Sequence, residues 1–482
     1  MMNFVSTRGL QQPVSGAQAV VQGLADDGGL FVPDFEIPHV QLQSLLSKDY
    51  VQLATEILAL WLPDYSRETI HSICAQAYDN DHFKDAIVPV CRVGENYVAE
   101  LWHGRTAAFK DMALSLLPYL MSASLRTLSV GRQVMILTAT SGDTGKAALE
   151  GFKNVDGTQI VVFYPTEGVS VVQKQQMITQ EGGNVHVTGI RGNFDDAQRA
   201  VKSLLNKRAD LQGNKWLISS ANSINIGRLL PQIVYYIWSY LELVRKNELL
   251  MGESVRVCVP SGNFGNCLAA YLAREMGVPF EKFMVASNRN KVLTDFFRTG
   301  VYDVNRPFYK TLAPAMDILV SSNLERLLWF VSEDKSLVAK WMNDLQSKGR
   351  FEVDGSTLGR IKQLFEAEYT DDSRILETIR SCYDETHYLL DTHTACAYQM
   401  VTESSQTKTL IMSTASPYKF ADTVWHALSG EKTDAYRSMD NLAEYTHIAM
   451  PEVLQGISER EVLHNEVIDK SEIEQRIRLW LK

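Results

Sequence analysis

The sequence lacks the patterns that mark most metal, redox and nucleic-acid-binding proteins. Among its 482 residues are six cysteines, and no two of them form a CxxC pair. The ten histidines include no HExxH pattern. The sequence has no block rich in lysine and arginine, and its formal net charge is −10. These absences exclude a disulfide framework, leave no metal signature, and make nucleic acid an unexpected partner.

Long apolar segments are missing as well. The N-terminal MMNFVSTRG has no apolar run of the kind found in signal peptides. The most apolar predicted helix, residues 229–244, is interrupted by Pro231, Gln232, Ser239 and Glu242, so it is predicted as core rather than as a membrane span. We therefore expect a cytoplasmic protein with no membrane partner, whose cysteines are buried thiols.

What the sequence does contain is an alternation of apolar runs and amphipathic segments from about residue 128. Strands are predicted at 134–137, 160–164, 185–190, 216–219, 255–259 and 409–412, and helices at 146–152, 170–181, 195–205 and 267–275. This order predicts an α/β fold with a largely parallel sheet and helices on both of its faces.

The regions outside this alternation have weaker or different signals. Residues up to about 95 are predicted to be mainly helical, because 40–62 and 67–78 carry apolar residues at helical spacing. Residues 286–385 are predicted as a mix of helices and loops, and the charged tail after about 430 as mostly helical.

Lys110 lies where a loop of small residues turns into an apolar-periodic helix that begins at Asp111. A lysine in this position can be desolvated and held in place, and such lysines form Schiff bases with carbonyl compounds. On this stretch alone a surface lysine beside an aspartate is the commoner explanation.

Three polar loops each follow a predicted strand. Residues 138–145, TATSGDTG, offer hydroxyls and backbone amides at a helix start, which suits a carboxylate or phosphate. A plain helix cap by Ser141, Asp143 or Thr144 explains this loop equally well. The spacing of its glycines excludes a nucleotide P-loop.

The second loop, PSGNFGN at 260–266, has glycines that let the backbone approach a phosphate, although it is not the GxGxxG dinucleotide fingerprint. In the third loop, STASP at 413–417, a threonine hydroxyl can meet a ring nitrogen. Taken singly, a tight turn and a helix cap are the ordinary explanations of these two loops. Ligands of open α/β sheets bind beyond the carboxyl ends of strands, so a Schiff-base lysine combined with a phosphate cradle indicates pyridoxal 5'-phosphate (PLP).

The motifs ELWHGRTAAFKD, LTATSGDTG, SSANSIN with Arg228, VPSGNFGN, PAMDI and STASPYKF, together with QGLADDGGLFVP near the N-terminus, resemble the threonine synthase family. The resemblance implies a fold-type-II PLP enzyme of tryptophan-synthase-like fold, with two open, mostly parallel sheets flanked by helices and a helical N-terminal domain. It also implies conversion of O-phospho-L-homoserine and water to L-threonine and phosphate.

The resemblance assigns roles residue by residue. Lys110 matches the Schiff-base lysine and catalytic base. The matching cofactor-binding residues are Gly262, Asn263, Phe264, Gly265 and Asn266 around the phosphate and Thr414 beside the pyridine nitrogen. The substrate-binding residues are Ser141, Gly142, Asp143 and Thr144 for the carboxylate, and Asn222, Ser223, Asn225 and Arg228 for the phosphate. No metal ligand is implied.

Two positions depart from the family pattern. Arg105 stands where the family usually has proline in HGPT, and Ser416 where many members have histidine in STAHP. Arg105 bears on the rigidity of the local backbone and adds a cation. Ser416 removes a group that could transfer protons.

Two alternatives remain open at this level: another fold-type-II enzyme such as a serine or threonine dehydratase, and a non-catalytic PLP-binding protein of this family. We expect a monomer or homodimer. Five segments are predicted: an N-terminal mainly helical domain at 1–95, the lysine-bearing segment of the large catalytic domain at 96–127, a small α/β domain at 128–217, the large PLP-binding α/β domain at 218–430, and a C-terminal helical tail at 431–482.

Overall fold

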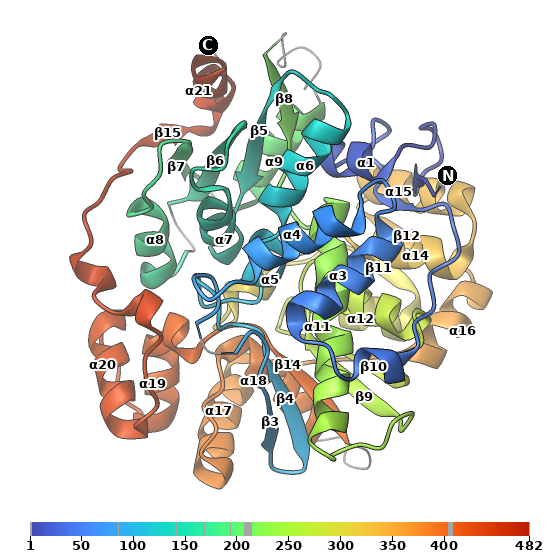
Figure 1. Cartoon of the computed structure of the whole chain (residues 1–482). Helices are drawn as coiled ribbons and strands as arrows, with labels where there is room; N and C mark the ends of the chain where they lie inside the picture. Colours follow the sequence, from blue (N-terminus) through green and yellow to red (C-terminus); the bar gives the residue numbers. More distant parts are fainter. Residues whose placement is uncertain are drawn as a thin grey trace.

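Two mostly parallel sheets organise the chain, as Figure 1 shows. The computed structural model describes residues 2–481 apart from 85, 141, 167–168, 193, 207–214 and 403–407. The large sheet has six strands in the order β13-β10-β9-β14-β4-β3, and the small sheet has five in the order β15-β7-β6-β5-β8. The expectation of a fold with two open sheets and flanking helices is confirmed.

The strands of the large sheet are β3 (Val90–Val93), β4 (Asn96–Glu100), β9 (Val255–Pro260), β10 (Phe280–Ser287), β13 (Phe365–Tyr369) and β14 (Thr409–Ser413). All neighbours run parallel except β3, which pairs with β4 in antiparallel fashion. Strand β14 is buried along its whole length, as expected for a parallel strand covered on both faces.

The small sheet is entirely parallel and consists of β5 (Gln133–Ala139), β6 (Thr158–Pro165), β7 (Val185–Arg191), β8 (Trp216–Ser219) and β15 (Val467–Asp469). Its helices are α7 (Asp143–Phe152), α8 (Val171–Ile178) and α9 (Phe194–Asn206). Each predicted strand of this region is present, with boundaries that differ by a few residues.

The N-terminal region contains α1 (Gly16–Gln22), α2 (Leu42–Leu45), α3 (Tyr50–Trp61) and α4 (Arg67–Ala77), together with the short hairpin of β1 (Phe4–Ser6) and β2 (Phe31–Pro33). Helices α1 and α3 pack against α11 (Ile226–Arg245), most of whose side chains are buried, and α4 packs on α3. The predicted helix at 229–244 is therefore a core helix, and none of the described helices is both long enough and apolar enough to cross a membrane.

Several elements differ from the sequence-based expectation. The region 286–385 contains α13 (Val292–Thr299), α14 (Leu324–Ser332), α15 (Lys335–Lys348), α16 (Gly355–Leu364) and α17 (Asp372–Thr386), but also β11 (Val301–Asp303), β12 (Arg350–Glu352) and the edge strand β13. The C-terminal tail includes α20 (Ala435–Thr446) and α21 (Ile473–Trp480), and between them the chain returns to the small sheet as strand β15 (Figure 1).

Candidate active site

The candidate site lies where three neighbouring strands of the large sheet end. Strands β9, β14 and β4 are adjacent, and their carboxyl ends lead into the glycine loop, the Thr414 loop and the Lys110 loop. In the small sheet, the neighbours β5 and β8 lead into the loop before α7 and the segment 220–228. All the loops that the sequence singled out thus follow carboxyl strand ends, the usual place of a ligand in open α/β folds.

The loop that carries Lys110 is held against the end of β14 by backbone hydrogen bonds. The amide of Phe109 donates to the carbonyl of Thr414 (2.8 Å), and the amide of Ser416 donates to that of Ala107 (3.0 Å). Ala107 adopts a left-handed conformation (φ 55°), which turns the chain into α5 (Asp111–Leu114). Lys110 therefore stands at a loop-to-helix junction, as predicted, with its backbone fixed from both sides.

The environment of the Lys110 amine favours the uncharged form. Its Nζ lies 3.4 Å from Oδ2 of Asp143, and its side chain is 12% exposed. Burial lowers the pKa of Lys110; Asp143 opposes this shift, whereas the charges of Arg228 and Lys419 add to it. A lysine with a lowered pKa is suited to act as a nucleophile and a base near neutral pH.

Lys419 is a site residue that the sequence analysis missed. Its side chain is fully buried, and its Nζ bonds Oδ1 of Asp143 and the carbonyl oxygen of Thr106, both at 2.8 Å. Gln173 donates a third hydrogen bond to the Asp143 carboxylate (2.7 Å). Although burial disfavours its charge, Lys419 and Lys110 hold the pKa of Asp143 far below its usual range, so this carboxylate is ionised.

Asp111, beside Lys110 in sequence, turns away from it. Its two oxygens accept from the amide (2.8 Å) and the hydroxyl (2.6 Å) of Thr106. Burial raises the pKa of Asp111 to about 6 despite these hydrogen bonds. The sequence alternative of a surface lysine paired with its neighbouring aspartate is therefore wrong, because both side chains are buried and Lys110 pairs with Asp143.

The glycine loop presents unpartnered backbone amides. Among the described residues, none of the amides from Gly262 to Asn266 has a hydrogen-bond acceptor. Phe264 is left-handed (φ 65°) at the start of α12 (Gly265–Glu275), and a Cβ on Gly262 would lie 3.1 Å from the carbonyl oxygen of Ala315. Successive free amides at a helix N-terminus match a phosphate.

The side chains of the same loop stabilise this conformation. Asn266 accepts from the hydroxyl of Ser261 (3.1 Å) and the amide of Cys267 (2.9 Å), and donates to the carbonyl of Pro260 (3.1 Å). The buried Oδ1 of Asn263 has no donor among the described residues. Asn266 thus shapes the loop, while Asn263 offers an acceptor to a bound molecule.

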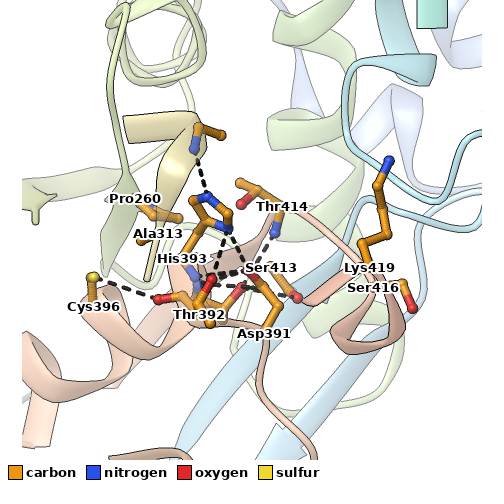
Figure 2. Close-up of polar contacts among 12 residues, drawn as sticks. Pro260, Ala313, Asp391, Thr392, His393, Cys396, Ser413, Thr414, Ser416 and Lys419 are labelled. Atoms are coloured by element: carbon orange, nitrogen blue, oxygen red, sulfur yellow. Dashed lines mark hydrogen bonds and ion pairs between the residues drawn. The ribbon is translucent and has the colours of Figure 1, made fainter. Parts of the chain in front are cut away.

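Thr414 directly follows β14 and lies beside a hydrogen-bond network shown in Figure 2. Thr394 donates its only hydroxyl proton to Asp391 and accepts from the amide of Thr414 (3.4 Å). His393 accepts from the amide of Ala315 at Nε2 (3.0 Å), so its ring proton is on Nδ1 and donates to Asp391 (2.9 Å). This network, also missed in the sequence analysis, joins Thr414 to Ala315, whose carbonyl oxygen lies beside Gly262.

The loop before α7 is only partly described, because Ser141 lies outside the described residues. Gly142 has φ 144°, a conformation that other residues rarely adopt, and its amide donates to the hydroxyl of Thr140 (2.9 Å). Thr144 is half-buried in the first turn of α7. Since Asp143 is an anion, its side chain cannot receive a substrate carboxylate directly, and we expect hydroxyls and amides of the loop to do so.

The segment 222–228 contains a buried cation with no carboxylate partner in the described part of the chain. Arg228 is 3% exposed and donates from Nη1 to the carbonyl of Ala221 (2.9 Å). Its buried Nε has no acceptor among the described residues, and burial lowers its pKa to about 10. An unpaired buried guanidinium is costly unless an anion binds it, so this position fits a phosphate.

The other residues of that segment divide into two groups. Asn222 and Ser223 are half-buried and lie on the loop. Asn225 is fully buried and caps α11: its Oδ1 accepts from Gly227 (2.9 Å), and its Nδ2 donates to the carbonyls of Val20 (3.0 Å) and Ser220 (3.1 Å). Its side chain is fully engaged, so we expect Asn225 to position the segment rather than contact a ligand.

The two departures from the family pattern have structural roles. Arg105 donates from Nε to the carbonyl of Asp81 (2.9 Å) and lies 3.6 Å from Glu150, outside the Lys110 pocket. Ser416 is fully buried and accepts the amide of Tyr418 (3.4 Å), capping the short helix Pro417–Phe420 that carries Lys419. Neither departure disturbs the surroundings of Lys110.

The described residues contain no cluster that could hold a metal ion, and all six cysteines are free thiols. The lysine, the amide cradle, the threonine after β14 and the orphaned Asn263 oxygen together fit PLP. Lys110 would hold its aldehyde carbon, the glycine loop its phosphate, and Thr414 its ring nitrogen.

Comparison with known proteins agrees with this site. Residues 93–412 match the family model described as pyridoxal-phosphate dependent enzyme, residues 3–78 that of the threonine synthase N terminus, and residues 393–477 that of the threonine synthase C-terminal region. The chain is a fold-type-II PLP-dependent enzyme by family and fold. More narrowly, it belongs to the threonine synthase family.

Individual relatives support that assignment. Threonine synthase from Saccharomyces cerevisiae is 34% identical, with 86% of this chain and 87% of the yeast protein covered. The PLP-bound threonine synthase of Brucella melitensis superposes with a TM-score of 0.87 at 33% identity, over 99% of both chains. Human threonine synthase-like 1 is 37% identical over 95% of this chain, which spans 65% of the human protein's length.

Proposed function

We propose that this chain is a threonine synthase, which converts O-phospho-L-homoserine and water to L-threonine and phosphate. The observation that carries the proposal is the buried Arg228, whose guanidinium meets no carboxylate of the described residues and lies close enough to Lys110 to lower the pKa of its amine. A substrate with an amine at one end and a phosphate at the other fits both residues, because its amine can replace Lys110 on the cofactor and its phosphate can bind Arg228. In this proposal the enzyme acts on a small molecule, in the cytoplasm, as a monomer or homodimer.

The roles of the protein groups follow from their surroundings. When bound, PLP supplies an aldehyde for the substrate amine and a ring that withdraws electrons from the bonds at the α carbon. The uncharged Lys110 amine, released by the substrate amine, removes protons from the α and β carbons. A positioned base of this kind contributes about 10²–10⁴-fold in rate.

Arg228 stabilises the phosphate as the bond between the γ carbon and oxygen breaks, since its planar guanidinium makes paired charge-assisted hydrogen bonds. The loop at Gly142 and Thr144 orients the substrate carboxylate with backbone amides and a hydroxyl. A hydroxyl group from water is added at the β carbon, and protons are returned to the γ and α carbons, which balances the two protons that Lys110 removes. Thr414, a neutral group, does not force protonation of the pyridine nitrogen as an aspartate would.

The alternative of a serine or threonine dehydratase shares the cofactor residues but needs no phosphate pocket, so it leaves the buried Arg228 without a function. The deciding experiment incubates purified holoenzyme with O-phospho-L-homoserine and measures phosphate and L-threonine, with keto-acid formation from L-threonine measured in parallel. Equal amounts of phosphate and threonine are expected. Keto acid alone would identify a dehydratase, and a cofactor spectrum without either product would identify a non-catalytic binder.

A further inference from the structure

Arg326 is a fully buried arginine that has no part in the roles described so far. Each nitrogen of its guanidinium donates to a different segment: Nε to the carbonyl of Phe31 (2.9 Å), Nη1 to Oδ1 of Asn323, and Nη2 to the carbonyl of Ile224 (2.7 Å). The planar guanidinium has its donors in a rigid fork, so these three groups are held in one fixed arrangement.

Two of these segments lead directly to the two proposed phosphate sites. Asn323 donates its backbone amide (3.0 Å) and its Nδ2 (3.1 Å) to the carbonyl of Asn263, in the glycine loop. Ile224 lies between Ser223 and Asn225, in the segment that carries Arg228. The two segments also lie close together, because a Cβ added to Gly265 would lie 3.7 Å from Cβ of Ser223.

The third segment belongs to the N-terminal region. Phe31 is in β2, and Asn225 is tied to the same region through the carbonyl of Val20 in α1. The hairpin β1–β2 and helix α1 thus hold the segment 222–228 in place, through Arg326 and Asn225 respectively. This gives the N-terminal region a specific structural role beside the site.

Among the described residues, no carboxylate contacts the guanidinium of Arg326 to neutralise its charge. Its three acceptors are neutral oxygens, and burial lowers its pKa to about 9. The neighbouring Glu325 is already bound by two nitrogens of Arg8 (2.9 and 3.0 Å) and the hydroxyl of Thr7 (2.6 Å). A buried cation between two anion sites is stabilised when those sites are filled.

We propose that Arg326 is a positioning residue that fixes the glycine loop relative to the segment 222–228 and so selects the chain length of the phosphorylated amino acid. The inference rests on the proposed function. With the cofactor phosphate in one site and the substrate phosphate in the other, the separation of the sites determines how many bonds can span them. One carbon–carbon bond adds about 1.5 Å, and a displacement of about 1 Å can cost about 10²-fold in rate.

The test compares phosphate release from O-phospho-L-homoserine with release from O-phospho-L-serine, which is one carbon shorter, in wild type and Arg326→Lys holoenzyme. Lysine keeps the charge but cannot bridge three segments. We expect the kcat/KM for O-phospho-L-homoserine divided by that for O-phospho-L-serine to fall at least about 10-fold. An unchanged ratio, with both activities lowered equally, would overturn the proposal, since a merely structural role lowers both alike.

Glu325→Gln is the matched control, because it weakens the neighbouring contact of the N-terminal region with α14 and leaves the bonds of Arg326 in place; its ratio should equal that of wild type. If Arg326→Lys does not fold, Asn323→Ala decides, since it removes the Oδ1 that accepts from Arg326 and the Nδ2 that donates to Asn263, keeps the backbone bond to Asn263, and should lower the ratio as well. An unchanged ratio in Asn323→Ala would then overturn the proposal.

A second readout is independent of turnover. Calorimetric titration of the apoenzyme with inorganic phosphate should show about 10-fold weaker binding in Arg326→Lys than in Glu325→Gln, and equal affinities would contradict the proposal. If the wild-type holoenzyme releases phosphate from neither substrate, the proposed function fails, while this titration still tests whether Arg326 organises the phosphate sites.

Discussion

Lys110 and Lys419 approach opposite oxygens of one carboxylate, that of Asp143, at 3.4 and 2.8 Å. A buried carboxylate with a single lysine would hold that lysine as an ammonium. Here the fully buried Lys419 makes the closer contact and repels the second charge. The charge of Lys419 thus adds to burial in lowering the pKa of Lys110, which a Schiff-base lysine requires.

Replacing Lys110 with alanine should abolish both the cofactor absorbance band of the Schiff base and turnover, because it removes the amine that we expect to hold the cofactor aldehyde. The measurement is the absorbance spectrum of the reconstituted protein, together with phosphate release from O-phospho-L-homoserine. Retained turnover without added amine would contradict the assignment of Lys110. Lys153→Ala, a substitution in a surface ion pair with Glu181, is the control and should leave both signals unchanged.

The Lys419→Met substitution should make cofactor attachment more dependent on high pH. Asp143 would then pair only with Lys110, so the pKa of Lys110 rises and less of its amine is unprotonated at neutral pH. The rate of reconstitution of apoenzyme with PLP, followed by absorbance across a pH series, should have its rising limb at higher pH than in wild type. Removal of one partner of a buried ion pair also costs about 3–5 kcal/mol of unfolding free energy, and we expect a value at the lower end because Lys110 still faces Asp143.

Two variants control that experiment. Lys419→Arg keeps the charge and should restore most of the wild-type profile. Lys146→Met removes a different buried lysine, which is in α7 and binds Glu150 and not Asp143. This substitution should lower stability without shifting the rising limb of the pH profile. A wild-type profile in Lys419→Met would show that Asp143 does not link the two lysines.

Arg228→Lys should weaken substrate binding through the loss of paired hydrogen bonds to the phosphate. Charge-assisted hydrogen bonds are each worth about 1.5–3 kcal/mol, so kcat/KM for O-phospho-L-homoserine should fall by about 10–100-fold, while the cofactor spectrum persists. Steady-state kinetics with inorganic phosphate as competitive inhibitor provides the check. An unaltered inhibition constant would place the phosphate elsewhere.

Ser416→Ala should cost about 0.5–2 kcal/mol of stability through loss of a helix cap, with little change in kcat. The side chain is fully buried and caps the turn carrying Lys419, so we expect no part for it in proton transfer. Chemical denaturation and the pH profile of kcat are the measurements. A large fall in kcat with unchanged stability would instead assign the hydroxyl a chemical role.

The sequence predicted the local features of the site well. Lys110 at a helix start and the loop around Gly262 each depend on patterns within a dozen residues, and the order of strands brings them to adjacent strand ends. Strand β13, by contrast, directly follows a helix and contains Glu366, Ala367 and Glu368, residue types that favour helices, so its sequence does not distinguish it from a continuing helix.

Residues whose function depends on distant partners could not be predicted. Lys419 is in a four-residue 3-10 helix and Arg326 is in α14, and only the folded structure shows that Lys419 meets Asp143 and that Arg326 meets Phe31 and Ile224. The role of Asn225 as a helix cap likewise became visible only from its contacts with Val20 and Ser220. The assignments of the individual substrate-binding residues stay predictions until they are measured.

The return of the chain to the small sheet as β15 has a consequence for association between copies. Strand β15 pairs along Gly189–Arg191 of β7, so it covers an edge whose amides and carbonyls would otherwise be open to another strand. Strand β15 thus prevents another chain from pairing with this edge of β7. We expect that shortening the chain before Val467 would promote self-association in addition to loosening the fold.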